Sequence, residues 1–132
     1  MLVEGEISPT DIKQGALGDC YFLSAMCVLG KARVEELFVD CFEDPKVGAY
    51  LIRFHKNDNP EYVIVDDFFP VGHNDNWAFC QTDSGTELWP MIIEKAYAKL
   101  HMGYDNIAAG KVQYALSDLT GGTPEEIRLA PQ

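Results

Sequence analysis

Basic residues are scarce in this sequence: 10 lysines and arginines stand against 21 aspartates and glutamates in 132 residues, a formal net charge of −11. So acidic a surface repels phosphate backbones and anionic lipid, which argues against nucleic-acid and membrane-surface partners. No apolar run approaches the roughly 18 residues needed to span a bilayer. The first residues also lack the basic start and apolar run of a secretory signal. We therefore expect a cytoplasmic protein with no transmembrane segment.

The cysteines do not form any C-x-x-C pair, which excludes a zinc knuckle and a thioredoxin-type motif. They stand at Cys20, Cys27, Cys41 and Cys80. A chain of this length can bury a core without disulfides, and no secretion signal accompanies the cysteines. We expect reduced thiols in an intracellular setting.

What the sequence does contain is enough apolar content, 47%, for one globular domain of α+β class. The residue patterns predict helices and a small antiparallel hairpin. Helices are expected over 20–29, ending at Gly30, over 33–38, and over 112–120, and hairpin strands over 50–55 and 62–66. A further helix, apolar on one face, follows a capping-box spacing of Ser84 and Glu87 and stops at Gly103.

The segment 14–25 carries the chemistry. Gly15 and Gly18 let the backbone turn tightly, and Cys20 then opens an apolar helix that is expected to be buried. Unpaired amides and the helix dipole favour a thiolate at that position and can stabilise an oxyanion when the sulfur attacks a carbonyl. Gln14 could add a side-chain donor. The alternative is a small buried cysteine that merely opens a core helix.

Four ordered segments, at 14–25, 61–71, 87–100 and 117–122, resemble the calpains, the papain-like cysteine proteases regulated by calcium. The first contains Gln-Gly-x-x-Gly-Asp-Cys followed by an aromatic residue. The second contains Asp-Asp and Pro-Val, the third Glu-Lys-Ala-Tyr-Ala-Lys, and the fourth Asp-Leu-Thr-Gly-Gly. The resemblance implies a helix-rich, papain-like half-domain with a central helix led by Cys20.

By this resemblance Cys20 is the nucleophile and Gln14 the oxyanion donor. The family also needs a histidine base and an orienting asparagine, which lie on a second subdomain. His55, His73 and His101 do not match the family's catalytic position. Residues 1–132 thus resemble the first, nucleophile-bearing subdomain, and the chain alone is expected to be inactive.

The resemblance also implies a calcium site in this half, made by two backbone carbonyls and two carboxylates. Val3, Gly5, Asp11 and Glu94 fall at the corresponding places, although the spacing from Gly5 to Asp11 is one residue longer than usual. Mixed carbonyl and carboxylate oxygens suit Ca²⁺. The alternative is that Asp11 caps a loop while Glu94 makes a contact within its helix.

The function implied is that of a calcium-regulated intracellular cysteine endopeptidase, which cuts protein substrates through a thioester acyl-enzyme. Its partner would be the second protease subdomain. Two departures from the family pattern are Tyr21, where a tryptophan is usual, and Pro90 at a helix opening. They leave open a non-enzymatic calpain-like module that binds calcium or a protein. A cysteine acyltransferase or deubiquitinating relative is a third alternative.

Overall fold

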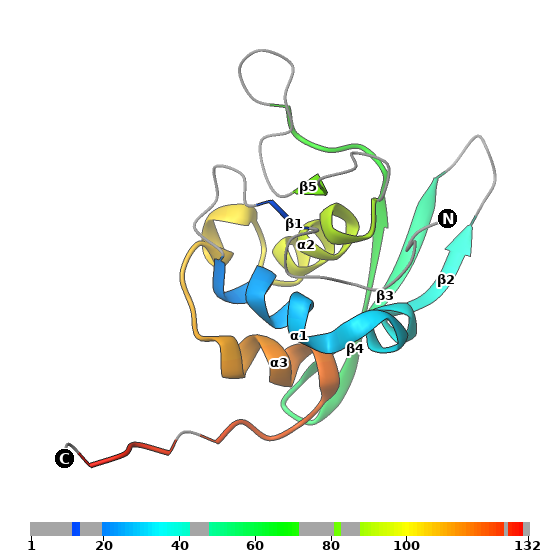
Figure 1. Cartoon of the computed structure of the whole chain (residues 1–132). Coiled ribbons are helices and arrows are strands. Elements are labelled where there is room, and N and C mark those ends of the chain that lie inside the picture. The colour runs from blue at the N-terminus through cyan, green and yellow to red at the C-terminus, as the bar shows by residue number, and fades with distance from the viewer. Residues whose placement is uncertain are drawn as a thin grey trace.

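The computed structural model describes residues 12–13, 20–42, 48–71, 81–82, 88–125 and 127–130. A three-stranded sheet lies at one side of the molecule, and the helices gather beside it (Figure 1). The predicted α+β class is confirmed, and so is the central helix led by Cys20.

The sheet is antiparallel, with the strand order β2-β3-β4. Strand β3 (Ala49–Lys56) and strand β4 (Asn59–Asp66) form the predicted hairpin. Asn57 and Asp58 connect them with φ of 49° and 63°, the left-handed conformation that a two-residue hairpin turn requires. Strand β2 (Phe38–Phe42) also pairs with β3, so the sheet contains one strand more than the predicted hairpin.

A second, two-stranded sheet joins distant parts of the chain. Strand β1 (Ile12–Lys13) pairs antiparallel with strand β5 (Gln81–Thr82). This pairing connects the region just before Cys20 with the region just before the next helix.

Helix α1 (Cys20–Leu37) is two helical pieces joined at Gly30, whose φ of 74° and ψ of 165° are not helical. The predicted break at Gly30 is therefore confirmed. Glycine suits this position because it adopts positive φ without the steric penalty of a side chain. The second piece ends at Leu37, one residue earlier than predicted, and the chain continues directly into β2.

Helix α2 (Trp89–Leu100) is buried along almost its whole length. Its N-cap is Leu88, so the predicted capping box at Ser84 and Glu87 does not start this helix. Pro90 lies in the first turn, where the missing N–H removes no helical hydrogen bond.

Between α2 and the last α-helix, the chain passes through Gly103 and a short 3-10 helix. Gly103 donates its N–H to the carbonyl of Ala98 at 2.8 Å and ends α2 close to the predicted place. The 3-10 helix η3 (Tyr104–Ile107), which the residue pattern did not predict, leads into α3 (Val112–Thr120). Helix α3 has the predicted bounds and ends at Gly121, which has a φ of 77°.

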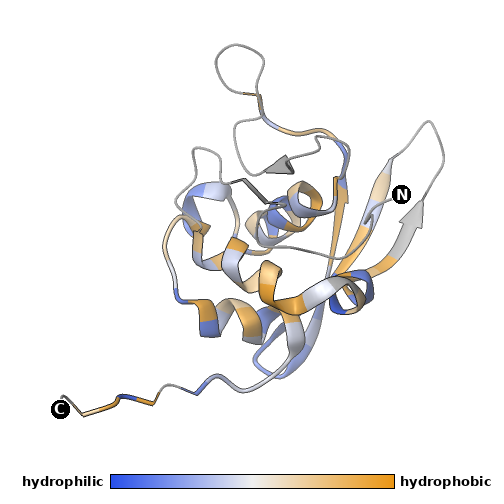
Figure 2. Cartoon of the chain, viewed as in Figure 1, coloured by the Kyte–Doolittle hydropathy of each residue, from blue (hydrophilic) through white to orange (hydrophobic). Residues whose placement is uncertain are grey.

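One apolar core joins the three α-helices to the inner faces of β3 and β4. Figure 2 shows hydrophobic residues along these elements and hydrophilic residues at the hairpin turn. The edge of β4 is covered by lysines of α2: Lys99 donates to the carbonyl of Ile64 at 2.7 Å, and Lys95 pairs with Asp66. The ammonium of Lys95, together with the N–H of Phe68, lowers the pKa of Asp66. Such charges protect an open sheet edge from pairing with another chain.

After α3 the chain runs away from the body of the molecule (Figure 1), and Ile127 and Leu129 are exposed on this segment. Across the described ranges, we find no helix with both the length and the apolar character required to cross a membrane.

Candidate active site at the start of helix α1

Cys20 is the first residue of α1, and it is exposed to solvent. The first N–H groups of an α-helix have no acceptor within the helix, so they point toward a group placed at this end. The sulfur therefore lies where a reacting carbonyl could reach both it and the backbone donors at the start of the helix. The exposure excludes the alternative of a cysteine buried in the core. Gln14, the predicted oxyanion donor, lies outside the described residues.

Tyr21 anchors the first turn of α1. Its hydroxyl donates to the carbonyl of Ile107 in η3 at 2.9 Å. Its ring lies so close to Gly110 that a Cβ added there would come within 2.7 Å of the Tyr21 Cζ. The tyrosine that departs from the calpain pattern is thus held by a hydrogen bond and by a glycine that leaves room for the ring.

The next residue, Phe22, anchors α1 to helix α2. Its ring stacks on that of Tyr97 in α2, with centroids 4.0 Å apart and an interplanar angle of 9°. Phe54 of β3 contacts the same Tyr97 ring at 5.6 Å between centroids. Aromatic pairs in this arrangement add to the stabilisation from area burial. The start of α1 is therefore fixed to both α2 and the sheet.

Tyr97 is itself held by a charged pair. Its hydroxyl donates to Oδ2 of Asp118 at 2.7 Å, and the Lys56 ammonium donates to the same oxygen at 2.7 Å. Burial raises the pKa of Tyr97 above its usual value, and the hydrogen bond to the Asp118 carboxylate raises it further. Tyr97 is therefore a neutral donor at any ordinary pH. The three residues join α2, α3 and β3 behind the helix that carries Cys20.

One stripe of α1 remains open to solvent. Cys20, Ser24 and Val28 are spaced four residues apart, so they lie on one face, and all three are exposed. Val28 is 71% exposed, although it is apolar. The prediction that this helix is buried was thus wrong for one face. The apolar residues on the other faces bury the helix, while the Cys20 face is left uncovered.

The contacts of the two described histidines do not include Cys20. His55 lines a small cavity with Arg33 and Leu37 at the opposite end of α1. His101 follows α2, and its Nδ1 lies 3.0 Å from the carbonyl oxygen of Tyr97. His73 lies outside the described residues. In the described ranges, then, Cys20 is exposed to solvent and makes no hydrogen bond to a histidine.

The whole chain, residues 1–132, matches the family described as "Calpain family cysteine protease". The chain belongs to the calpain family. It is 44% identical over 133 residues to the calpain-type cysteine protease ADL1 of Oryza sativa subsp. japonica, which covers 99% of this chain and 6% of that protein. It is 43% identical over 129 residues to the calpain-type cysteine protease DEK1 of Arabidopsis thaliana, covering 97% of this chain and 6% of that protein.

A more distant calpain is similar over the same span. The calpain-2 catalytic subunit of Gallus gallus is 34% identical over 137 residues, covering 98% of this chain and 19% of that protein. The chain thus spans a small part of the length of the calpains it matches. Membership of the family is shown for the domain, and the activity of a whole calpain has to be proposed separately.

Of the predicted calpain-like calcium ligands, only Glu94 lies within the described residues. It sits on the buried part of α2 and is 2% exposed. Val3, Gly5 and Asp11 fall outside the described ranges, so the calcium site stays a prediction. Within those ranges, no cluster of three or more histidine, cysteine, aspartate or glutamate side chains could hold a metal ion.

The support behind Cys20 was missed by reasoning from the sequence. Tyr97 and Asp118 both lie in segments that resemble calpains, at 87–100 and 117–122. A tyrosine and a carboxylate inside otherwise apolar helical patterns are the signal that could have suggested a buried hydrogen bond. Lys56, at the end of β3, gave no such signal.

Proposed function

We propose that this domain is the nucleophile-bearing half of a calpain-type cysteine endopeptidase, with Cys20 as the nucleophile. The observation that carries the proposal is the exposed Cys20 at the first position of α1, on a helix whose next two residues are anchored to η3 and α2. A nucleophile needs access to substrate and a fixed position, because small displacements of reacting groups slow the reaction steeply.

The chemistry would proceed in two stages. The Cys20 sulfur attacks the carbonyl carbon of a peptide bond, and the C–S bond forms as negative charge develops on the carbonyl oxygen. The amides at the start of α1, with Gln14 as a further donor, would stabilise that charge. The intermediate expels the amine, which takes up a proton, and leaves a thioester. Water then attacks the thioester, releasing the new carboxyl group and regenerating the thiol.

Both stages need a base, and the residues that the structure describes give Cys20 no hydrogen bond to a histidine. We assign the base and its orienting asparagine to a second subdomain, which would pack over the open face of α1. The exposed Val28 on the same face as Cys20 supports this partner, since an apolar side chain gains stability when a surface covers it. Protein substrates would bind between the two halves. Neither Cys20 nor Cys27 forms a disulfide, which fits a reducing, cytoplasmic location.

Casein cleavage tests the proposal. The isolated chain is expected to leave casein intact, because no base takes the proton from Cys20. A longer form that carries the second subdomain is expected to cleave casein, and Cys20→Ala in that form should abolish cleavage. Cleavage by the isolated chain that Cys20→Ala abolishes would place the base within residues 1–132. An inactive longer form would favour the alternative, a calpain-like module that binds calcium or a protein without cutting.

Calcium regulation is a second part of the proposal. The predicted donors are the carboxylates of Asp11 and Glu94 and the carbonyls of Val3 and Gly5, all oxygen ligands of the kind that Ca²⁺ prefers. Glu94 supports the site because a carboxylate that is 2% exposed is stabilised in its charged form by a neighbouring cation. A bound Ca²⁺ would stabilise that charge and connect the region before Cys20 to α2.

Thermal melting measures the binding of Ca²⁺ and does not require peptidase activity. Because Ca²⁺ would bind the folded form preferentially, millimolar Ca²⁺ should raise the melting temperature, and Mg²⁺ should raise it less. Asp11→Asn should reduce the shift, while Glu61→Gln, at an exposed position of β4, should leave it unchanged. If calorimetry detects no binding of Ca²⁺ at millimolar concentration, this half lacks the calcium site.

A further inference from the structure

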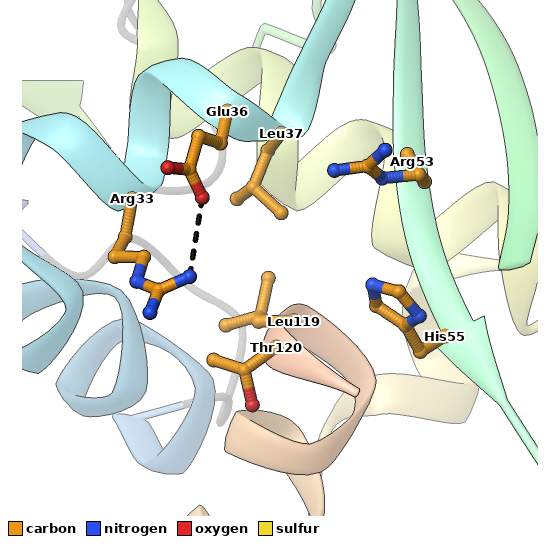
Figure 3. Close-up of a pocket in the computed structure, with 7 residues that line it drawn as sticks. All are labelled: Arg33, Glu36, Leu37, Arg53, His55, Leu119 and Thr120. Carbon is orange, nitrogen blue, oxygen red and sulfur yellow. Dashed lines mark hydrogen bonds and ion pairs between the residues drawn. The ribbon is translucent and has the colours of Figure 1, made fainter. Parts of the chain in front are cut away.

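A second site-like feature lies at the end of α1 opposite Cys20. A cavity of about 60 Å³ opens between the last turns of α1, the strand β3 and the end of α3. Figure 3 shows its lining, with Arg53 and His55 of β3 facing Arg33 of α1 across the hollow. Two arginines and a histidine thus face one small space in a chain whose net charge is −11.

Two of these basic side chains have no hydrogen-bond or ion-pair partner among the residues that the structure describes. Among the described residues, neither the Arg53 guanidinium nor the His55 imidazole makes a hydrogen bond or an ion pair. A guanidinium carries a fixed charge and a planar fork of donors that matches a carboxylate or a phosphate. An imidazole in either neutral tautomer presents one further N–H donor. The donors for one oxyanion are therefore present and unused.

The charge balance of the cavity indicates which oxyanion fits. Glu36 accepts from Arg33 at 3.2 Å, so these two side chains neutralise one another (Figure 3). Arg53 is left as the one unneutralised guanidinium among the cavity's lining residues. A carboxylate, with a single negative charge, matches it. A phosphate dianion would bring more charge than the remaining guanidinium offsets.

The floor of the cavity is apolar. Leu37 and Leu119 line it from α1 and α3, and both are buried. The Thr120 hydroxyl is already used, because it donates to the carbonyl of Leu116 at 2.7 Å. The space therefore offers charged donors next to two leucine side chains, which suits a carboxylate on a short aliphatic stem. A volume of about 60 Å³ admits a small group of this kind and excludes a nucleotide.

We propose that this basic cavity, formed by Arg33, Arg53, His55, Leu37 and Leu119, binds the carboxylate of a single glutamate side chain presented by a protein segment. The net charge of −11 disfavours a run of carboxylates, so the site selects one acidic residue with neutral neighbours. The site lies far along α1 from Cys20 and does not depend on the proposed peptidase chemistry.

Two short peptides test the proposal on the purified chain. Acetyl-Ala-Ala-Glu-Ala-Ala-amide and its glutamine counterpart differ only in one carboxylate. Titration followed by ¹H–¹⁵N NMR should shift the Arg53 side-chain signal and the His55 ring signals with the glutamate peptide at millimolar concentration. The glutamine peptide should bind roughly tenfold more weakly or not at all, because it cannot offer a charge-assisted hydrogen bond. Inorganic phosphate is titrated in parallel.

Three variants define the contact. Arg53→Gln should abolish the shifts, Arg53→Lys should weaken binding because the forked geometry is lost, and Arg128→Gln on the exposed C-terminal segment should change nothing. Glu36→Gln should strengthen binding, since it releases Arg33 as a second guanidinium, and it should favour phosphate more than the glutamate peptide. Equal binding of the two peptides, or unchanged binding in Arg53→Gln, would overturn the proposal. Tighter binding of phosphate than of the glutamate peptide to the unmodified chain would overturn the choice of a carboxylate.

Discussion

The two faces of the first half of α1 differ in what they contact. Phe22 and Met26 are completely buried, and Phe22 stacks on Tyr97 of α2. Cys20, Ser24 and Val28, on the neighbouring face, are exposed. The packed face fixes the helix in place, whereas the open face carries the thiol. The same helix can therefore be rigid and accessible, because different side chains provide the two properties.

This difference predicts the largest effect for a substitution on the packed face. Met26→Ala removes a fully buried side chain, and we expect it to lower the free energy of unfolding by about 2–5 kcal/mol. The matched control is Val28→Ala, two positions along, at a side chain that is 71% exposed. Its effect should stay within about 0.5 kcal/mol. Urea unfolding measures both, and equal losses would show that the two faces do not differ as described.

A smaller effect is expected behind the packed face, at Tyr97. Tyr97→Phe keeps the ring that stacks on Phe22 but removes the hydrogen bond to Asp118. Because Asp118 is buried and would lose a donor, we expect a loss of about 1–3 kcal/mol in the free energy of unfolding.

The same variant gives a pH signature. The pKa of Tyr97 is raised in the folded chain, so the unfolded chain ionises first, at pH values near 10.0. The contribution of Tyr97 is therefore fully present below that pH and is lost as the pH rises above it. The stability gap between the unmodified chain and Tyr97→Phe should narrow under alkaline conditions. A gap that widens there would contradict the assigned direction of the shift.

Local patterns predicted the elements that local interactions determine. The end of the helix over 112–120 and the break at Gly30 were recognisable from glycine positions. The hairpin of β3 and β4 was recognisable from β-branched and aromatic residues on both sides of the turn cluster at 57–60. Strand β2 was missed because its existence depends on pairing with β3, which no pattern within 38–42 reveals. The predicted capping box at Ser84 and Glu87 lies outside the described residues, and the helix that follows begins at Trp89 with Leu88 as its N-cap.

The candidate site also has one part that local sequence patterns predict and another part that they do not. The sequence around Cys20 predicted a thiol at the start of a helix, since glycines and an apolar periodicity mark that place, and the structure confirms it. The support from Tyr97, Asp118 and Lys56 comes from three separate elements. Such long-range contacts depend on the packing of the helices on the sheet, so local spacing could not predict them.

The most direct test of Cys20 as the nucleophile compares it with Cys27 on the same helix. Cys27 is half-buried, whereas Cys20 is exposed at the helix start, where the backbone N–H groups have no acceptor within the helix. We would treat the folded chain with a limiting amount of iodoacetamide at neutral pH and follow both cysteines by peptide mass spectrometry, with the urea-unfolded chain as the control for intrinsic reactivity. The account predicts that Cys20 is alkylated faster than Cys27 in the folded chain and that the difference disappears on unfolding. Equal rates in the folded chain, or faster alkylation of Cys27, would contradict it.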